Sequence, residues 1–145
     1  MRRLVCRAFL ALPFAAVALG ASPASAPTGE TVKPVFEHVL PNAPGKSMMA
    51  VVVNYAPGGK SAPHHHAPSA FIYAHVLSGS IRSKVDDQPA KVYAAGEGFY
   101  ETPGAHHAIS ENASSTEPAS LLAVFVVDSK DKMLTTPDTG EVSGK

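Results

Sequence analysis

Short runs of apolar and β-branched residues, each ended by a turn sequence, follow one another along most of this 145-residue chain. Examples of the turn sequences are Pro57-Gly58-Gly59, Ser78-Gly79 and Pro103-Gly104. Beyond the first 26 residues, no apolar stretch repeats with the period of a helix. Many short strands separated by turn residues are typical of β-sandwiches and β-barrels. We therefore expect an all-β fold with little helix.

The pattern predicts eight strands. They lie at residues 35–40, 47–55, 70–77, 80–85, 91–94, 99–101, 106–110 and 120–127. Two of them, 47–55 and 120–127, are apolar on both faces, which is typical of strands whose two faces are both covered. For the segment 120–127, a second subunit would supply the outer cover, so we expect a homodimer.

The N-terminus has the order of residues of a secretory signal peptide. A basic start with Arg2, Arg3 and Arg7 precedes an apolar run that ends near Leu19 and is too short to span a bilayer. A proline at position 13 argues against a buried N-terminal helix. We expect an exported protein, periplasmic or extracellular, with no membrane span in its mature form.

Composition divides the whole chain into four parts. We assign 1–26 to the signal peptide, 27–34 to a flexible lead-in, 35–130 to one domain and 131–145 to a polar tail. Removing the signal peptide leaves nine Lys and Arg residues against 12 Asp and Glu residues, a net charge of −3, which argues against a nucleic-acid partner. It also removes Cys6, the single cysteine, so no disulfide is expected.

Six of the seven histidines lie between positions 58 and 112. In an extended strand, His64 and His66 share one face and His65 points the other way. Such a His-x-His pair can chelate one ion, and a third imidazole from a neighbouring strand would leave open positions for water or substrate. By the same rule His106 and His107 cannot both point inward, so one is the ligand candidate.

Two segments resemble the two motifs of the cupin superfamily. The first runs from Gly58 through the pair His64 and His66 to Gly79, and the second runs from Gly96 through Pro103-Gly104 to Asn112. The resemblance implies a double-sheet jelly-roll barrel. It also implies a metal ion held by His64, His66 and His107, because the last histidine of the second motif lies five residues after the position of Thr102.

The resemblance leaves one ligand open. The first cupin motif usually has an acidic ligand shortly after its histidine pair, where this chain has Ser69, Ala70, Phe71 and Ile72. Three replacements are open: Glu101, His75 or a water molecule. Glu101 also fits a surface carboxylate in a salt bridge, and His75 also fits a strand position that usually carries an aromatic residue.

Three imidazoles suit iron, nickel, copper, zinc or manganese. Three functions then remain open for such a barrel. It is a metal-dependent oxygenase or isomerase acting on a small molecule, a non-catalytic module that binds or senses a small ligand or metal, or a barrel with a structural metal. The missing acidic ligand weakens the catalytic interpretation, and no catalytic residue is identified.

Overall fold

A computed structural model describes residues 29–138, which form ten strands and no helix. The strands are β1 (Glu30–Val39), β2 (Lys46–Tyr55), β3 (His64–His66), β4 (Phe71–Ser78), β5 (Ser80–Val85), β6 (Lys91–Ala94), β7 (Gly98–Glu101), β8 (His106–Asn112), β9 (Ala119–Asp128) and β10 (Thr135–Pro137). The predicted all-β class is confirmed. No helix that could cross a membrane is present in this range.

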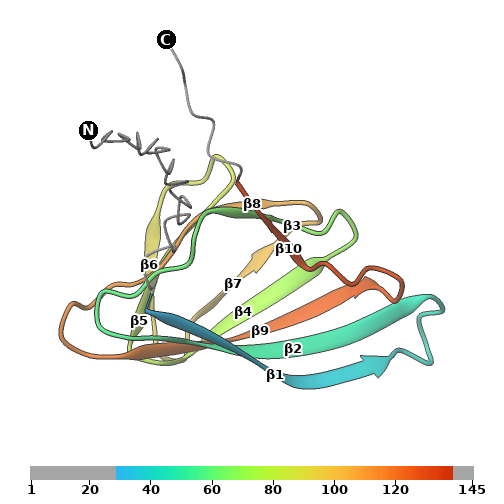
Figure 1. Ribbon diagram of the computed structural model, residues 1–145, viewed down its shortest axis with the longest axis horizontal. Coiled ribbons are helices and arrows are strands. Elements are labelled where there is room, and N and C mark those ends of the chain that lie inside the picture. Colours follow the sequence, from blue (N-terminus) through green and yellow to red (C-terminus); the bar gives the residue numbers. More distant parts are fainter. Residues whose placement is uncertain (1–28, 139–145) are drawn as a thin grey trace, which may run out of the picture.

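The strands form two five-stranded sheets that lie in two layers (Figure 1). Sheet A has the strand order β1-β2-β9-β4-β7, and sheet B has the order β10-β3-β8-β5-β6. All the paired strands run antiparallel, and strands that are neighbours in a sheet are often far apart in sequence. This is the double-sheet jelly roll that the cupin resemblance implies.

The core lies between the sheets and follows from the two-residue period of the strands. In β9, buried and half-buried side chains alternate along the whole strand. Ile72 of β4, Ile81 of β5 and Val127 of β9 are among the most completely buried side chains. Of the outward positions of β2 and β9, only Ala50 is buried in the single chain, and the others are half-buried or exposed. The prediction that both faces of β2 are buried is therefore wrong for the isolated chain.

Sheet A begins earlier in the sequence than predicted. β1 starts at Glu30 and pairs with β2 from Tyr55 onward, so part of the predicted lead-in 27–34 is strand. The sequence gives little sign of this because nearly all β1 side chains are exposed, and backbone pairing fixes the strand. The prediction of an edge strand is confirmed, and Pro34 is tolerated there beside a bulge.

The C-terminal region also contains a strand that the sequence does not predict. Residues 135–137, placed in the polar tail 131–145 by composition, form β10 and pair with β3. Their side chains are exposed, so the strand depends on the otherwise open edge of β3. The predicted signal peptide, 1–26, and the last residues, 139–145, lie outside the described residues.

Candidate metal centre

Two neighbouring strands of sheet B carry the histidines of the centre. β3 pairs with β8 so that His64 lies opposite His107, and His65 lies opposite His106. His66 and His107 are only 7% and 5% exposed, whereas His65 is exposed. Adjacent residues of each strand therefore point to opposite sides of the sheet, as the parity rule predicts. The inward set is His64, His66 and His107.

The three inward imidazoles lie close enough to share one ion. Each offers a nitrogen atom, and these atoms all lie within 4.8 Å of one another. The ring centroids of His64 and His66 are 4.8 Å apart, and those of His64 and His107 are 5.4 Å apart. A tetrahedral ion needs nitrogen atoms about 3.3 Å apart. Small side-chain rotations would bring the three nitrogens to that separation.

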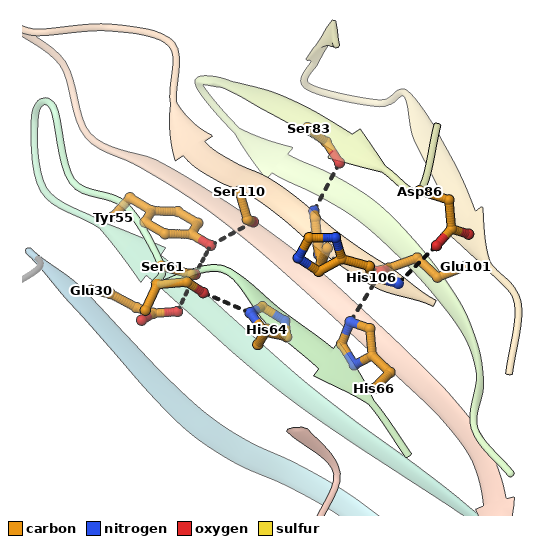
Figure 2. A network of polar contacts seen from close by, with 12 residues as sticks. Glu30, Tyr55, Ser61, His64, His66, Ser83, Asp86, Glu101, His106 and Ser110 are labelled. Carbon is orange, nitrogen blue, oxygen red and sulfur yellow. Dashed lines mark hydrogen bonds and ion pairs between the residues drawn. The ribbon is translucent and has the colours of Figure 1, made fainter. Parts of the chain in front are cut away.

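Glu101 brings a buried carboxylate to the same place from β7 in sheet A. Its side chain is 3% exposed, and its Oε2 atom is 3.0 Å from His66 Nε2 (Figure 2). The same oxygen is 3.3 Å from His107 Nδ1. Neither Glu101 Oε2 nor His66 Nε2 makes a hydrogen bond within the described residues. Buried polar atoms without partners are costly. An ion between them would satisfy both, so these residues fit a transition metal.

Hydrogen bonds hold two of the imidazoles in a defined orientation. His64 Nδ1 donates to the carbonyl oxygen of Ala62 at 2.8 Å, which leaves its Nε2 atom with a free lone pair. His107 Nε2 is 2.9 Å from the hydroxyl oxygen of Ser83, while its Nδ1 atom lies on the side of Glu101. Such bonds at the outer nitrogen fix the tautomer and ring orientation of metal-binding histidines.

Burial also keeps the imidazoles in the form that binds metal. It lowers the pKa of His107 from 6.5 to about 4, although the nearby Glu101 carboxylate acts in the opposite direction. Burial likewise lowers the pKa of His64 below its usual value. A metal ion binds only the neutral imidazole. At neutral pH these two histidines therefore need not lose a proton before they bind an ion.

The structure distinguishes between the two side chains proposed as a fourth ligand. Glu101 lies beside the histidines, whereas His75 lies on the outward side of β4 with its Nδ1 atom 3.2 Å from the Tyr73 hydroxyl. The proposal of His75 as a ligand is therefore wrong. Glu101 lies opposite Ile72 in the pairing of β4 with β7. A carboxylate from the neighbouring strand thus approaches the region where the cupin motif places its acidic ligand.

A pocket of about 460 Å³ opens beside the histidines. Val51, Val53, Leu121 and Phe125 give it apolar walls, and one wall is polar. The polar wall is a chain of hydrogen bonds that joins Glu30, Ser61, Tyr55 and Ser110 (Figure 2). Apolar walls with a few convergent polar groups are typical of small-molecule sites.

Sequence patterns do not identify this polar wall. Tyr55 stands at the centre of it, with its hydroxyl 2.7 Å from Ser61 Oγ and 2.8 Å from Ser110 Oγ. Burial raises the pKa of Tyr55, so its hydroxyl stays protonated. The residues of the polar wall come from β1, β2, the loop before β3 and β8, and nothing in their spacing relates them. Only the pairing of the strands brings them together.

Comparisons with known proteins agree with the fold. The family model of the cupin domain matches residues 51–125. An oxalate oxidase solved with the substrate analogue glycolate is 26% identical, with a TM-score of 0.53, and the match covers 80% of this chain and 63% of that chain. A recombinant oxalate oxidase with glycolate is 27% identical, with a TM-score of 0.55 and coverage of 79% and 59%.

A more distant structure has the same fold. The cupin-2 domain protein of Rhodospirillum rubrum is 20% identical, with a TM-score of 0.59 and coverage of 84% of this chain and 74% of that chain. At this identity, the likeness concerns the fold alone. No curated protein matches the sequence. The chain spans about three-fifths of the length of the two oxalate oxidases.

Proposed function

This chain belongs to the cupin-domain family, and from that premise we propose that it binds one divalent transition metal ion and acts with it on a small molecule. The reaction class we propose is that of a metal-dependent oxygenase or isomerase. One observation carries the proposal. The buried atoms Glu101 Oε2 and His66 Nε2, neither of which makes a hydrogen bond, lie 3.0 Å apart at the wall of a pocket large enough for a small ligand.

Four side chains would hold the ion: His64, His66, His107 and Glu101. Three imidazoles and one carboxylate suit iron, manganese, zinc, nickel or copper, and the donor set disfavours calcium and magnesium. When bound, such an ion supplies a Lewis acid or an oxygen-binding centre. The Ala62 carbonyl and the Ser83 hydroxyl orient two of the imidazoles through their outer nitrogens.

The other residues of the pocket select and position the ligand. The apolar side chains of β2 and β9 would contact the apolar part of the ligand. The hydroxyl of Tyr55, with Ser61 and Ser110, offers both donors and acceptors to a polar group of the ligand. Glu30 accepts a hydrogen bond from the Ser61 hydroxyl, so the hydrogen bonds of the polar wall all run in one direction, toward Glu30.

The charge of the pocket narrows the proposed ligand. The likeness to oxalate oxidases supports metal chemistry on a small oxygen-containing molecule. Among the described residues that line the pocket, Lys132 is the one Lys or Arg, and two carboxylates, Glu30 and Glu101, face it. With the proposed divalent ion bound, Lys132 and the two carboxylates leave a net charge of +1, which disfavours a cationic ligand. We therefore propose a neutral or anionic ligand that carries a hydroxyl or carbonyl group.

We also propose that the protein is exported and works as a homodimer. The basic and apolar order of residues 1–19 supports export. The exposed aromatic residues Phe71, Tyr73 and Tyr100, on the outward side of sheet A, support self-association. No nucleic acid is proposed as a partner, because the mature chain is slightly acidic.

Metal content and turnover test the proposal together. Purified mature protein should retain close to one tightly held transition metal ion per chain. His107→Ala should lose it, while the matched neighbour variant His106→Ala should keep it. A screen of the metal-loaded protein against small hydroxy and carbonyl compounds should then reveal turnover. Ligand binding without turnover would favour a binding or sensing module, and equal metal retention in the two variants would contradict the ligand assignment.

A further inference from the structure

The outward side of sheet B carries a second group of metal-binding side chains. His65 of β3 lies opposite His106 of β8, and on its other side His65 lies opposite Thr136 of β10. Asp138 follows Thr136 by two residues and reaches the same side. Strands β3 and β8 and the residue after β10 thus each bring one side chain to a single place outside the barrel.

The three side chains are close enough to bind a single ion. Asp138 Oδ2 is 2.9 Å from His106 Nε2, and Asp138 Oδ1 is 3.8 Å from His65 Nε2. The two imidazole rings stack, with centroids 4.4 Å apart and an angle of 17° between their planes. One ligand atom from each residue lies within 4.8 Å of the others. The carboxylate already spans the two imidazoles with its two oxygens.

We propose that His65, His106 and Asp138 form a second metal site, which binds a divalent transition ion such as Zn²⁺ or Cu²⁺ independently of the barrel. Two imidazoles and one carboxylate are ligands that Zn²⁺ and Cu²⁺ accept, and two imidazoles disfavour Ca²⁺ and Mg²⁺. The site is partly open, since the side chains of His65, His106 and Asp138 are 57%, 34% and 38% exposed. Water would complete the coordination, so binding is weaker than in the barrel.

Backbone contacts hold the three strands around this site. The amide of His106 donates to Asp86 Oδ1 at 2.8 Å, at the start of β8. The amide of Asp138 donates to the carbonyl of Pro63 at 3.0 Å, which fixes the end of β10 against β3. The ligands are therefore presented on paired backbone, and only side-chain rotation is needed for an ion to bind.

The outer and barrel sites are independent because of strand parity. The pair His64 and His107 points inward, and the next pair, His65 and His106, points outward. No side chain belongs to both groups. The outer site can therefore be removed while the barrel ligands stay in place, and its existence does not depend on the proposed function.

Equilibrium dialysis of the untagged mature protein against Zn²⁺ tests the second site. The wild-type protein should bind two ions per chain. As the concentration of free Zn²⁺ is lowered, the ion at the outer site should be released before the ion in the barrel. His65→Ala, His106→Ala and the isosteric Asp138→Asn should each lower the affinity of the outer site at least about tenfold and leave the barrel site occupied. His38→Ala, which removes an exposed histidine of β1, is the control and should keep both.

Copper provides a second readout that does not depend on counting ions. With Cu²⁺ at two equivalents, the electron paramagnetic resonance spectrum should contain a component with two nitrogen ligands, and His106→Ala should remove that component. If the three outer variants bind as much Zn²⁺ as the wild-type protein and the spectrum is unchanged, the contact of Asp138 with the histidines is only an ion pair. That result would overturn the proposal.

Discussion

Glu101 is the residue whose position is hardest to explain without a metal. Its side chain is 3% exposed, and its Oε2 atom has no hydrogen bond although two imidazoles lie within 3.3 Å. A buried carboxylate that lacks a full set of partners destabilises a fold by several kcal/mol unless its charge is compensated. A bound ion compensates the charge and uses the free oxygen. Under the proposed function, Glu101 serves metal binding at a cost to the stability of the metal-free chain.

Replacing Glu101 with Gln should separate these two effects. Because the amide is uncharged and nearly isosteric, the metal-free variant should be as stable as the wild-type protein or more stable by about 1–2 kcal/mol. The stabilisation by added metal should fall, since the carboxylate ligand is lost. Urea unfolding with and without chelator measures both. Glu111→Gln, at a surface pair with Arg82, is the control, and a lower stability of the metal-free Glu101→Gln protein would contradict the account.

His107 predicts how the metal-free protein responds to acid. Its pKa is lowered by burial from 6.5 to about 4, so the folded chain holds this imidazole neutral while the unfolded chain protonates it below pH 6.5. The neutral His107 therefore contributes about 3 kcal/mol to the free energy of unfolding. This contribution is fully present above pH 6.5 and is lost as the pH falls toward 4. Urea unfolding in chelator at pH 7 and pH 4.5 measures the loss. His107→Phe should reduce this loss, and an unchanged pH dependence would contradict the assignment.

At the level of elements, strand period explains what the sequence could predict. Eight of the ten strands, and the common face of His64 and His66, follow from turn residues and alternation. The choice of His107 over His106 needs the cupin resemblance, because alternation alone excludes only their joint use. β10 could not be predicted, since its exposed residues have no pattern and only pairing with β3 makes it a strand.

The turn between β4 of sheet A and β5 of sheet B is formed by Gly79. Gly79 has a φ of +69°, and a Cβ atom there would lie 2.7 Å from the carbonyl oxygen of Pro118 and 2.8 Å from the Cβ atom of Ala119. Gly96 also has a positive φ, +88°, but nothing lies within 4 Å of its missing Cβ atom. A side chain would therefore be strained at both glycines by the positive φ. Only at Gly79 would it also clash with neighbouring atoms.

This difference gives a matched pair of substitutions. Gly96→Ala should destabilise the protein by about 1 kcal/mol because of its backbone conformation alone. Gly79→Ala should cost about 1–3 kcal/mol more, because the backbone of Pro118 and Ala119 must also move. Chemical unfolding of the two variants measures the difference. Equal stabilities would show that the chain around Gly79 is less tightly packed than the structure indicates.

For the whole molecule, the outward side of sheet A carries a group of neighbouring apolar side chains that are exposed or half-buried. On this side, Phe71 and Tyr73 of β4 are 45% and 47% exposed. They lie beside three apolar residues of β9: Leu122, Val124 and Val126. Exposed apolar areas of this kind are typical of interfaces. A homodimer would cover them and leave the pocket, on the other side of the sheet, accessible.

Val124→Lys tests this interface, because it places a charge at the middle of the outward side of β9. The wild-type mature protein should be a dimer by size-exclusion chromatography with light scattering, and Val124→Lys should be a monomer. Val92→Lys on β6 replaces an exposed valine far from this side, so it should remain a dimer. A monomeric wild-type protein at micromolar concentration would remove the case for the interface.

Anomalous diffraction from crystals of the mature protein grown with Zn²⁺ tests the central claim most directly. The account predicts a strong peak inside the barrel, about 2.0–2.2 Å from one nitrogen each of His64, His66 and His107 and from one oxygen of Glu101. A weaker peak between His65, His106 and Asp138 would report the outer site separately. A metal-loaded crystal without a peak at the three inward histidines would contradict the account.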